Sequence, residues 1–192
     1  LSPDNGLPGW DRISGYFYPD STIAGFSHTH LSGTGAGDLY DISFMPVTLP
    51  YKEAEAPLGI HSLFSHSEES ASAGYYQVRL KDYNINVELT ATERCGIQRY
   101  TFPKAQSAVF LNLKKAMNWD FTQDSHIEVV DSCTIQGYRF SDGWARGQRV
   151  FFRTRFSKPF RSSEIDTTAI IQDGKTIGTA SVSYTHLRAH ET

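Results

Sequence analysis

Cysteine is almost absent from this chain of 192 residues, which contains only Cys95 and Cys133. Two cysteines are too few for a disulfide scaffold, and their separation does not fit the short spacings of metal-binding motifs. We therefore expect two free, buried thiols. The chain also lacks the Gly-x-Ser-x-Gly and His-Glu-x-x-His motifs, and Cys133 has no basic neighbour. Nucleophilic catalysis consequently has little support in these residues.

Long apolar runs and clusters of a single charge are missing as well. The longest apolar runs are short, such as Val109-Phe110-Leu111, so no membrane-spanning helix is expected. Lys and Arg number 18 against 21 Asp and Glu, which gives a net charge of -3 without a basic stripe. Nucleic acid is therefore not an expected partner. Aromatic residues, in contrast, make up 13% of the chain. Such residues favour strands, and exposed Tyr and Trp also stack against sugar rings in carbohydrate-binding clefts.

The periodicity of 3.6 residues that marks helices is almost absent, and strand patterns take its place. Alternation over 76–80 and 85–89, with a polar turn at 81–84, predicts a β-hairpin. Asp173-Gly174 predicts a second, tighter hairpin. Further strands are expected at 97–102, 107–113, 126–131, 133–140, 148–156, 164–172 and 175–181. Strands at intervals of about ten residues predict an all-β fold, an antiparallel β-sandwich in a single domain.

The first third of the chain is less regular. Residues 1–25 are rich in turn residues and rings, which predicts irregular, aromatic-rich loops. A short strand is expected at 42–47, with Pro46 ending it or placing it at a sheet edge. Residues 51–72 are polar and are expected to form a solvated connection that can include a helical turn.

Several aspartates lie in the same N-terminal region. Asp4 and Asp20 are expected to cap turns, which is a frequent role of this residue. Asp11 stands beside Trp10 and is a better candidate for contacting a ligand. No sequence spacing identifies an acid–base pair among them.

The segment Gly25–Gly35 contains the densest group of ligand-binding residue types, because His28 and His30 lie there among hydroxyls and glycines. On an extended strand the two histidines would leave the same face about 7 Å apart, a spacing that can chelate a metal. Cupin-type metal sites add a nearby carboxylate, but none follows before Asp38. Hydrogen bonding to sugar hydroxyls, or a structural polar network, is therefore favoured over metal binding. The glycine-rich turn also lacks the Lys-Ser/Thr of a phosphate loop.

Short motifs occur in a fixed order along the chain, and the segment Gly25–Gly35 is the most distinctive of them. The others are Leu1-Ser2-Pro3-Asp4, Gly9-Trp10-Asp11, Ser14-Gly15-Tyr16, Ser21-Thr22-Ile23, Asp41-Ile42 with Met45-Pro46, Ser65-His66 with Glu69, Gly74-Tyr75-Tyr76, Glu88-Leu89-Thr90-Ala91-Thr92, Arg99-Tyr100-Thr101-Phe102-Pro103 and Phe156-Ser157-Lys158-Pro159-Phe160. This series resembles the N-terminal domain of glycoside hydrolase family 92, the calcium-dependent exo-α-mannosidases. One departure is Gln98, which stands where a histidine is common in the family.

The resemblance implies a parent enzyme of two domains with its active site between them. The N-terminal domain is a β-sandwich of the galactose-mutarotase-like supersandwich type, and the C-terminal domain is an (α/α)6 helical barrel. Such enzymes hydrolyse terminal α-mannosides with inversion, using a glutamic acid and an aspartate whose carboxyl groups stand about 6.5–9.5 Å apart. Calcium helps to bind and distort the mannose.

In the family, the acid, the base and the calcium ligands come mainly from the helical domain, which this chain does not include. The resemblance therefore implies no catalytic residue and no metal ligand here, and this chain alone is expected to be inactive. The residues implied to face the mannoside or the domain interface are Trp10, Asp11, Tyr16, His28, His30, Ser32 and Thr34. The implied partners are mannose-containing glycans and the helical domain, and the implied location is secreted, periplasmic or cell-surface.

The sandwich domain is expected to span residues 1–181, truncated at both ends, and residues 182–192 are expected to be a non-native tail. This tail resembles the translation of a transposase-based sequencing adapter, so His186 and His190 carry no functional weight. Two alternatives stay open, namely a free-standing carbohydrate-binding β-sandwich module and a His-metal cupin-like enzyme.

Overall fold

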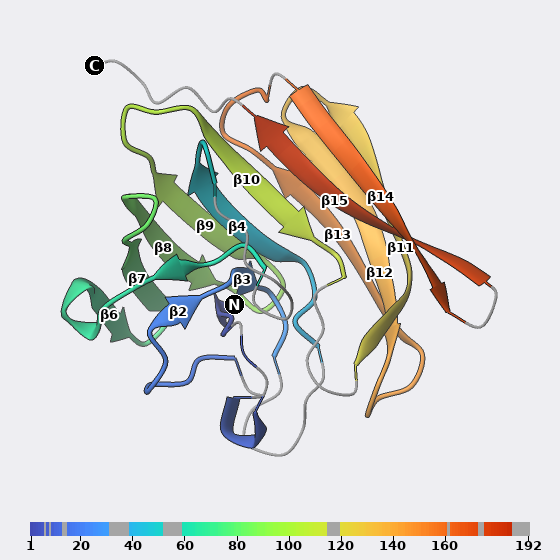
Figure 1. Ribbon diagram of the computed structural model, residues 1–192, viewed down its shortest axis with the longest axis horizontal. Helices are drawn as coiled ribbons and strands as arrows, with labels where there is room; N and C mark the ends of the chain where they lie inside the picture. The colour runs from blue at the N-terminus through green and yellow to red at the C-terminus, as the bar shows by residue number, and fades with distance from the viewer. Residues whose placement is uncertain are drawn as a thin grey trace.

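The computed structural model is built almost entirely from β-strands (Figure 1). It describes residues 1–5, 7, 9–12, 15–30, 39–51, 59–114, 120–160, 162–172 and 175–185, the last two ranges by their backbone only. The strands are β1 (Ser2–Pro3), β2 (Thr22–Ile23), β3 (Phe26–Ser27), β4 (Ser43–Thr48), β5 (Ser62–Leu63), β6 (Glu69–Ser72), β7 (Tyr75–Leu80), β8 (Ile85–Ala91), β9 (Gly96–Thr101), β10 (Ser107–Asn112), β11 (Phe121–Asp131), β12 (Thr134–Asp142), β13 (Gln148–Arg155), β14 (Ser162–Gln172) and β15 (Lys175–Thr185). Short 3-10 helices form at η1 (Trp10–Arg12) and η2 (His66–Glu68). Within the described ranges, no helix has the length and hydropathy needed to cross a membrane.

The strands pair antiparallel in four sheets, which confirms the predicted all-β architecture. The largest sheet has the order β1-β3-β4-β10-β15-β14, and a second has the order β6-β7-β8-β9. A third sheet contains β11, β12 and β13, and β2 pairs with β5. In Figure 1, β4 and β10 run between the β7–β9 strands on one side and the β11–β13 strands on the other. The sheets therefore pack face to face as a β-sandwich.

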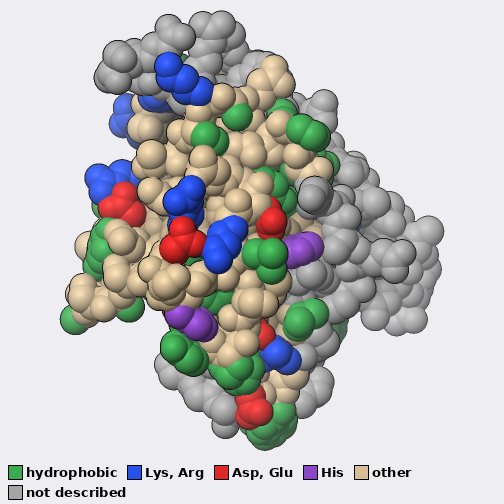
Figure 2. Space-filling model, turned by 60° about the vertical axis from the view of Figure 1, so that its left-hand side comes forward, with side chains coloured by type: hydrophobic (Ala, Val, Ile, Leu, Met, Phe, Trp, Pro, Cys, Tyr) green, Lys and Arg blue, Asp and Glu red, His purple; other side chains and the backbone are tan. Residues whose placement is uncertain are grey.

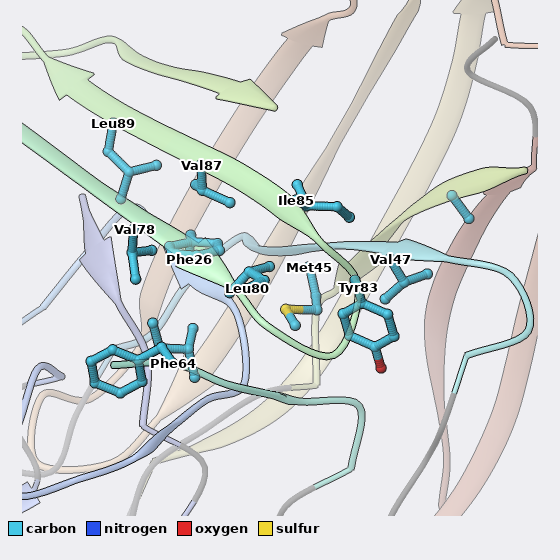
Figure 3. Close-up of a cluster of buried hydrophobic side chains, with 12 residues drawn as sticks. Phe26, Met45, Val47, Phe64, Val78, Leu80, Tyr83, Ile85, Val87 and Leu89 are labelled. Atoms are coloured by element: carbon cyan, nitrogen blue, oxygen red, sulfur yellow. The ribbon is translucent and has the colours of Figure 1, made fainter. Parts of the chain in front are cut away.

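Two hydrophobic cores lie on opposite faces of β4 and β10. Because successive side chains of a strand point to opposite faces, Met45 and Val47 enter the first core while Phe44 enters the second. The first core packs against β7 and β8, where Val78 and Val87 are buried (Figure 3). The second core packs against β11 and β12. Burial on both faces explains why five successive residues of β4 are buried.

The strand predictions from β7 onward are confirmed, with differences at the strand ends. The hairpin of β7 and β8 turns at 81–84, as predicted. β11 is longer than predicted, because it begins at Phe121. Asp173-Gly174 lies outside the described residues. β15 continues to Thr185, into the predicted tail of 182–192, and the foreign origin of that tail stays a prediction.

Pro46 lies inside β4 and does not end it, so the second of its two predicted roles applies. β3 pairs with β4 only through Phe26 and Phe44. Pro46 therefore has a paired residue, Val109, on the β10 side alone among the described strands. A local edge of this kind tolerates proline, because no ladder hydrogen bond is lost there.

Two other sequence predictions need correction. Within 51–72, η2 forms the helical turn that the sequence allows for, but β5 and β6 replace the solvated connection, and residues 52–58 lie outside the described residues. Both cysteines are free as expected, but they are not buried, since Cys95 is exposed and Cys133 is partly exposed. Polar composition misled the first prediction, because Glu69 accepts hydrogen bonds from Tyr16 and Tyr76 on other segments.

A buried arginine joins β12 to the rest of the sandwich. Arg139 is fully buried, and its guanidinium contacts Asp41 through Nη1 and Asp120 through Nη2, the latter at 3.0 Å. Its Nε donates to the Leu113 carbonyl at 3.1 Å and to Thr122 Oγ1 at 2.9 Å. Burial raises the pKa of Asp120, and the charge of Arg139 opposes this rise. One side chain thus holds groups from several segments that are distant in sequence.

Replacing Arg139 by Met tests this role. Methionine is similar in length but leaves Asp41 and Asp120 buried without a cation, so the free energy of unfolding should fall by about 3–5 kcal/mol. Urea denaturation measures the change. Arg153→Met, at an exposed position of β13, is the control and should change the free energy of unfolding by less than about 0.5 kcal/mol. Equal midpoints for the two variants would contradict the role assigned to Arg139.

Candidate functional site

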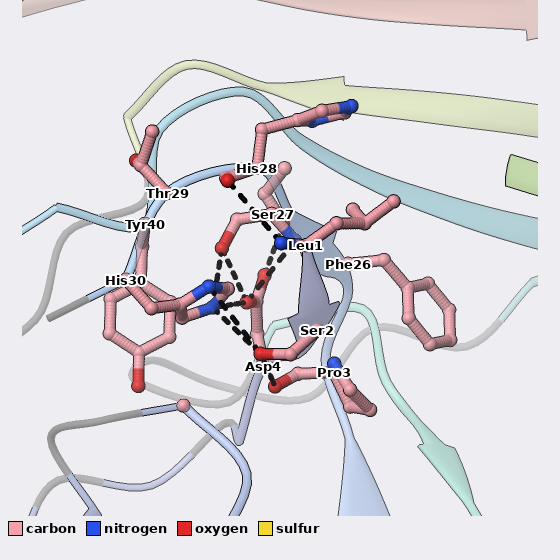
Figure 4. Close-up of polar contacts among 12 residues, drawn as sticks. Leu1, Ser2, Pro3, Asp4, Phe26, Ser27, His28, Thr29, His30 and Tyr40 are labelled. Carbon is pink, nitrogen blue, oxygen red and sulfur yellow. Dashed lines mark hydrogen bonds and ion pairs between the residues drawn. The ribbon is translucent and has the colours of Figure 1, made fainter. Parts of the chain in front are cut away.

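A network of buried polar side chains contacts residues 25–30, the described part of Gly25–Gly35 and here called the histidine segment. Asp4 is fully buried at the end of β1. Ser27 Oγ and Ser43 Oγ each donate to it at 2.6 Å, and His30 Nε2 lies 2.9 Å from its Oδ1 (Figure 4). The role of Asp4 goes beyond the predicted turn cap, because its carboxylate is the centre of contacts from β3, β4 and the histidine segment.

His30 is enclosed on several sides of this network. Only 11% of its side chain is exposed. Its imidazole ring packs edge-to-face with the ring of Tyr40, at a centroid distance of 5.0 Å. Gly15 has a φ of +100°, and a Cβ at this position would stand 2.6 Å from the His30 ring. Glycine is therefore required at position 15, and the partly buried His30 is held by its contacts with Ser27 and Asp4.

His28 points away from His30 (Figure 4). Its Nδ1 lies 3.0 Å from the Ile42 carbonyl oxygen, and its ring packs edge-to-face with Phe44. Burial lowers the pKa of His28, which is therefore neutral at neutral pH. β3 ends at Ser27, before the first histidine. The same-face arrangement expected of a regular strand consequently does not form.

The described residues do not fit a metal ion. They contain no group of three or more His, Cys, Asp or Glu side chains that could hold one. The rings of His28 and His30 contact different groups, so the cupin-like alternative has no geometric support in these residues. The calcium implied by the resemblance likewise finds no ligand set among them.

The backbone just before β4 is strained. Leu39, Tyr40 and Ile42 have φ values of 82°, 67° and 56°, in the left-handed region that non-glycine residues rarely adopt. Each such residue costs about 1–3 kcal/mol and persists only where its surroundings fix it. Here the N–H of Tyr40 donates to the Thr29 carbonyl at 3.0 Å, and the Asp41 carbonyl accepts from the N–H of His28 at 3.0 Å. Strain of this kind concentrates at functional sites, and here it lies directly against the histidine segment.

Two of the predicted ligand-binding residues are exposed on η1. Trp10 is 63% exposed, and Asp11 is also exposed. Their loop is anchored because Asn5 Nδ2 donates to the Arg12 carbonyl and Arg12 Nε donates to Asp20 Oδ1 at 2.8 Å. Asp20 thus forms an ion pair inside the loop, and the predicted turn-capping role is wrong. Figure 2 shows hydrophobic side chains gathered at the lower end of the molecule, the height at which η1 lies in Figure 1.

Tyr16, a third predicted residue, donates a hydrogen bond to Glu69 Oε1 at 2.8 Å. Tyr76 donates to Glu69 Oε2 at 2.7 Å, and His66 Nδ1 also contacts Oε1. Burial favours a raised pKa of Glu69, but hydrogen bonds from His66, Tyr76 and Tyr16 outweigh it and the pKa is lowered. Burial and the hydrogen bond to Glu69 raise the pKa of Tyr16. The sequence motifs contain these residues, but only the fold shows that Glu69 joins them.

The remaining positions complete the comparison with the sequence. Ser32 and Thr34 lie outside the described residues. Gln98 links β9 to β3, because its Nε2 donates to the Phe26 carbonyl at 3.4 Å and its Oε1 accepts from Tyr100. Substrate binding by the seven predicted residues stays a prediction.

Comparison with known proteins gives a consistent set of matches. The family model described as "Glycosyl hydrolase family 92 N-terminal domain" matches residues 1–190. A family GH92 α-mannosidase of Bacteroides thetaiotaomicron, solved with mannoimidazole, is 31% identical with a TM-score of 0.83, covering 96% of this chain and 26% of that chain. The family GH92 inverting mannosidase of the same organism is 21% identical with a TM-score of 0.72, covering 96% of this chain and 24% of that chain. The chain therefore spans about a quarter of the length of these enzymes. Curated protein sequences give no match.

The partly buried, neutral His28 predicts a pH-dependent stability. Because folding lowers the pKa of His28 below its ordinary value of 6.5, the unfolded chain binds the proton more tightly. The contribution of His28 to the free energy of unfolding should be complete above pH 6.5 and should decrease as the pH falls through the lowered pKa. His28→Asn keeps a donor near the Nδ1 position and should flatten this part of the profile, measured by urea denaturation between about pH 5 and 8.

The exposed His126 provides the matched control. His126→Asn should keep the pH dependence of the unaltered protein. A profile for His28→Asn as steep as that of His126→Asn would show that other groups cause the loss of stability.

Proposed function

We propose, from the premise that this chain belongs to the glycosyl hydrolase family 92 N-terminal domain family, that it forms the sandwich side of the substrate cleft in an inverting exo-α-mannosidase. The proposed substrates are the terminal α-mannosides of glycans. The observation that carries the proposal is the 31% identity, over 96% of this chain, to an α-mannosidase structure that holds mannoimidazole. Since the chain covers only 26% of that enzyme, the activity of the whole protein is part of the proposal.

The proposal assigns the acid, the base and the calcium ligands to a helical domain outside this chain. An inverting site needs two carboxyl groups about 6.5–9.5 Å apart with a water molecule between one of them and the sugar. Asp4, Asp41 and Asp120 are buried and committed to internal contacts, so they are unsuited to that role.

On this proposal, the sandwich contributes substrate contacts and their support. Trp10 offers an exposed ring for stacking on a sugar, and the neighbouring Asp11 offers oxygen atoms that accept hydrogen bonds from hydroxyls. His28 and His30 support these contacts from below, because their rings are held by the Ile42 carbonyl and by Asp4.

The partners of the parent protein follow from the same proposal. They are mannose-containing glycans and the helical domain, which completes the cleft. We place the parent protein outside the cytoplasm, as a secreted, periplasmic or cell-surface enzyme, as the resemblance implies. Calcium is proposed as its cofactor, bound by residues outside this chain.

A second candidate function is a free-standing carbohydrate-binding module. The observation that favours it is the exposure of Trp10 and Tyr18, at 63% and 64%, in one loop of the sandwich. Such a module binds α-mannosides without hydrolysing them, whatever sequence follows in the gene.

The reading frame that continues beyond this chain decides between the two functions. The extended protein should contain a helical domain and hydrolyse an α-mannoside to the β-anomer of mannose, which NMR detects because inversion changes the anomeric configuration. This chain alone should give no turnover. A stop codon or an unrelated domain, together with mannoside binding by this chain, would instead establish the binding module.

In the extended protein, Trp10→Ala should lower kcat/KM for an α-mannoside by about tenfold or more, since truncating an exposed aromatic contact removes its stacking energy. Trp144→Ala is the matched control, because Trp144 is 73% exposed but lies beyond β12, outside the N-terminal loops. Equal kcat/KM values for the two variants would remove Trp10 from the substrate cleft.

A further inference from the structure

Three sequence motifs, one of which contains the predicted site residue Tyr16, meet at one carboxylate. Tyr16, His66 and Tyr76 come from separate motifs, and all three contact Glu69. The Glu69 side chain is only 11% exposed. Hydrogen bonds to a carboxylate are stronger than those between neutral groups, so the cluster fixes the position of each donor. The rings of Tyr16 and Tyr76 also pack edge-to-face, at a centroid distance of 6.2 Å.

Tyr18 lies flat on the ring of His66. The two ring centroids are 4.0 Å apart and the planes differ by 8°. The buried Phe64 packs edge-to-face against the same imidazole, at 5.3 Å, and supports it from within. Tyr18 remains 64% exposed although one of its faces covers His66. Its opposite face is therefore open to solvent.

We propose that the Tyr18–His66 pair is a platform on which a pyranose ring stacks, with Glu69 as the residue that positions it. The face of an aromatic ring is electron-rich and attracts the polarised C–H groups on one side of a sugar. A stacking surface binds best when its rings are already fixed, because little conformational entropy is then lost on binding. The contacts of His66 with Glu69 and Phe64 provide that fixation.

The surroundings of the pair also suit a sugar. Glu68 lies in η2 with His66, and its carboxylate is 3.5 Å from Arg79 and 3.6 Å from Lys81. Exposed ion pairs of this length contribute little to stability, so little stability would be lost if Glu68 turned to accept hydrogen bonds from sugar hydroxyls. A single exposed ring would need no explanation. The ring of Tyr18, in contrast, stacks on His66, and His66 is held by Glu69, which also accepts hydrogen bonds from Tyr16 and Tyr76. This preorganised arrangement is typical of a binding surface.

The inference rests on the proposed function only for the identity of the sugar, which is mannose. The test therefore uses this 192-residue chain with two probes, methyl α-mannopyranoside and methyl α-glucopyranoside. NMR titration of each probe gives its dissociation constant, and saturation transfer identifies the sugar protons that approach aromatic rings. The variants are Tyr18→Ala and Tyr18→Phe. Tyr75→Ala, at an exposed tyrosine of β7, is the control.

We expect saturable binding that Tyr18→Ala weakens by about tenfold or more, as for the truncation of an aromatic contact at the centre of a binding site. Tyr18→Phe and Tyr75→Ala should bind as the unaltered chain does. Binding that Tyr18→Ala leaves unchanged, or no binding of either probe, overturns the platform. Binding of the glucoside alone supports the platform and contradicts the mannosidase, whereas failure of the platform leaves the hydrolysis assay of the extended protein untouched.

Glu69→Gln tests the positioning role separately. The amide keeps the shape of the side chain but loses the charge that attracts three donors. The dissociation constant for the bound probe should rise severalfold, and the ring signals of His66 should shift. A variant that unfolds at lower urea concentration but binds the probe with unchanged affinity would show that Glu69 only stabilises the fold.

Discussion

The buried ion pairs of Arg139 are the constraint on which the rest of this sandwich depends. Removing an arginine and two aspartates from water is expensive, and the expense is offset only when every charge finds a partner. Asp41 and Asp120 provide these partners from segments 98 and 19 residues away. The pairs therefore join the β11–β13 sheet to the backbone that leads into β4. Hydrophobic side chains fill the same interface, but they do not specify this register, because apolar contacts are not directional.

The strained backbone before β4 shows what this constraint supports. Asp41 lies between Tyr40 and Ile42, both in the left-handed conformation, and its side chain also accepts a hydrogen bond from Thr29 at 2.6 Å. The ion pair therefore fixes a segment that would otherwise relax, and that segment bonds the backbone of His28. The carboxylate of Asp4 contacts His30 directly. His30 is thus held by a buried carboxylate, and His28 by the backbone of the segment that the Asp41 ion pair fixes.

Local patterns predicted much of the fold but little of this polar framework. Alternation and turn residues identified β7, β8 and the later strands, because those signals depend on neighbours in the sequence. The local sequence around Asp4 and Asp20 is typical of turns, and it predicts a turn-capping role for the same reason. Their partners lie on other strands or across a loop, and only the tertiary fold brings these together. The sequence predicts no structural role for Glu69 or Arg139, because contacts over 53 and 98 residues leave no periodic signal.

The buried polar groups and the exposed aromatic rings of this domain have different roles, because the former fix the backbone and the latter are accessible on the surface. Functional loops depend on a rigid scaffold to position them, and here Asn5 and Arg12 hold the loop that carries Trp10 and Tyr18. Ordering a flexible side chain on binding costs about 0.5–1.5 kcal/mol. When buried contacts already order the loop in the folded protein, this conformational entropy is lost during folding and not on binding. A sandwich that buries Asp4, Asp41 and Asp120 and exposes the rings of Trp10 and Tyr18 therefore offers preorganised contacts on its surface.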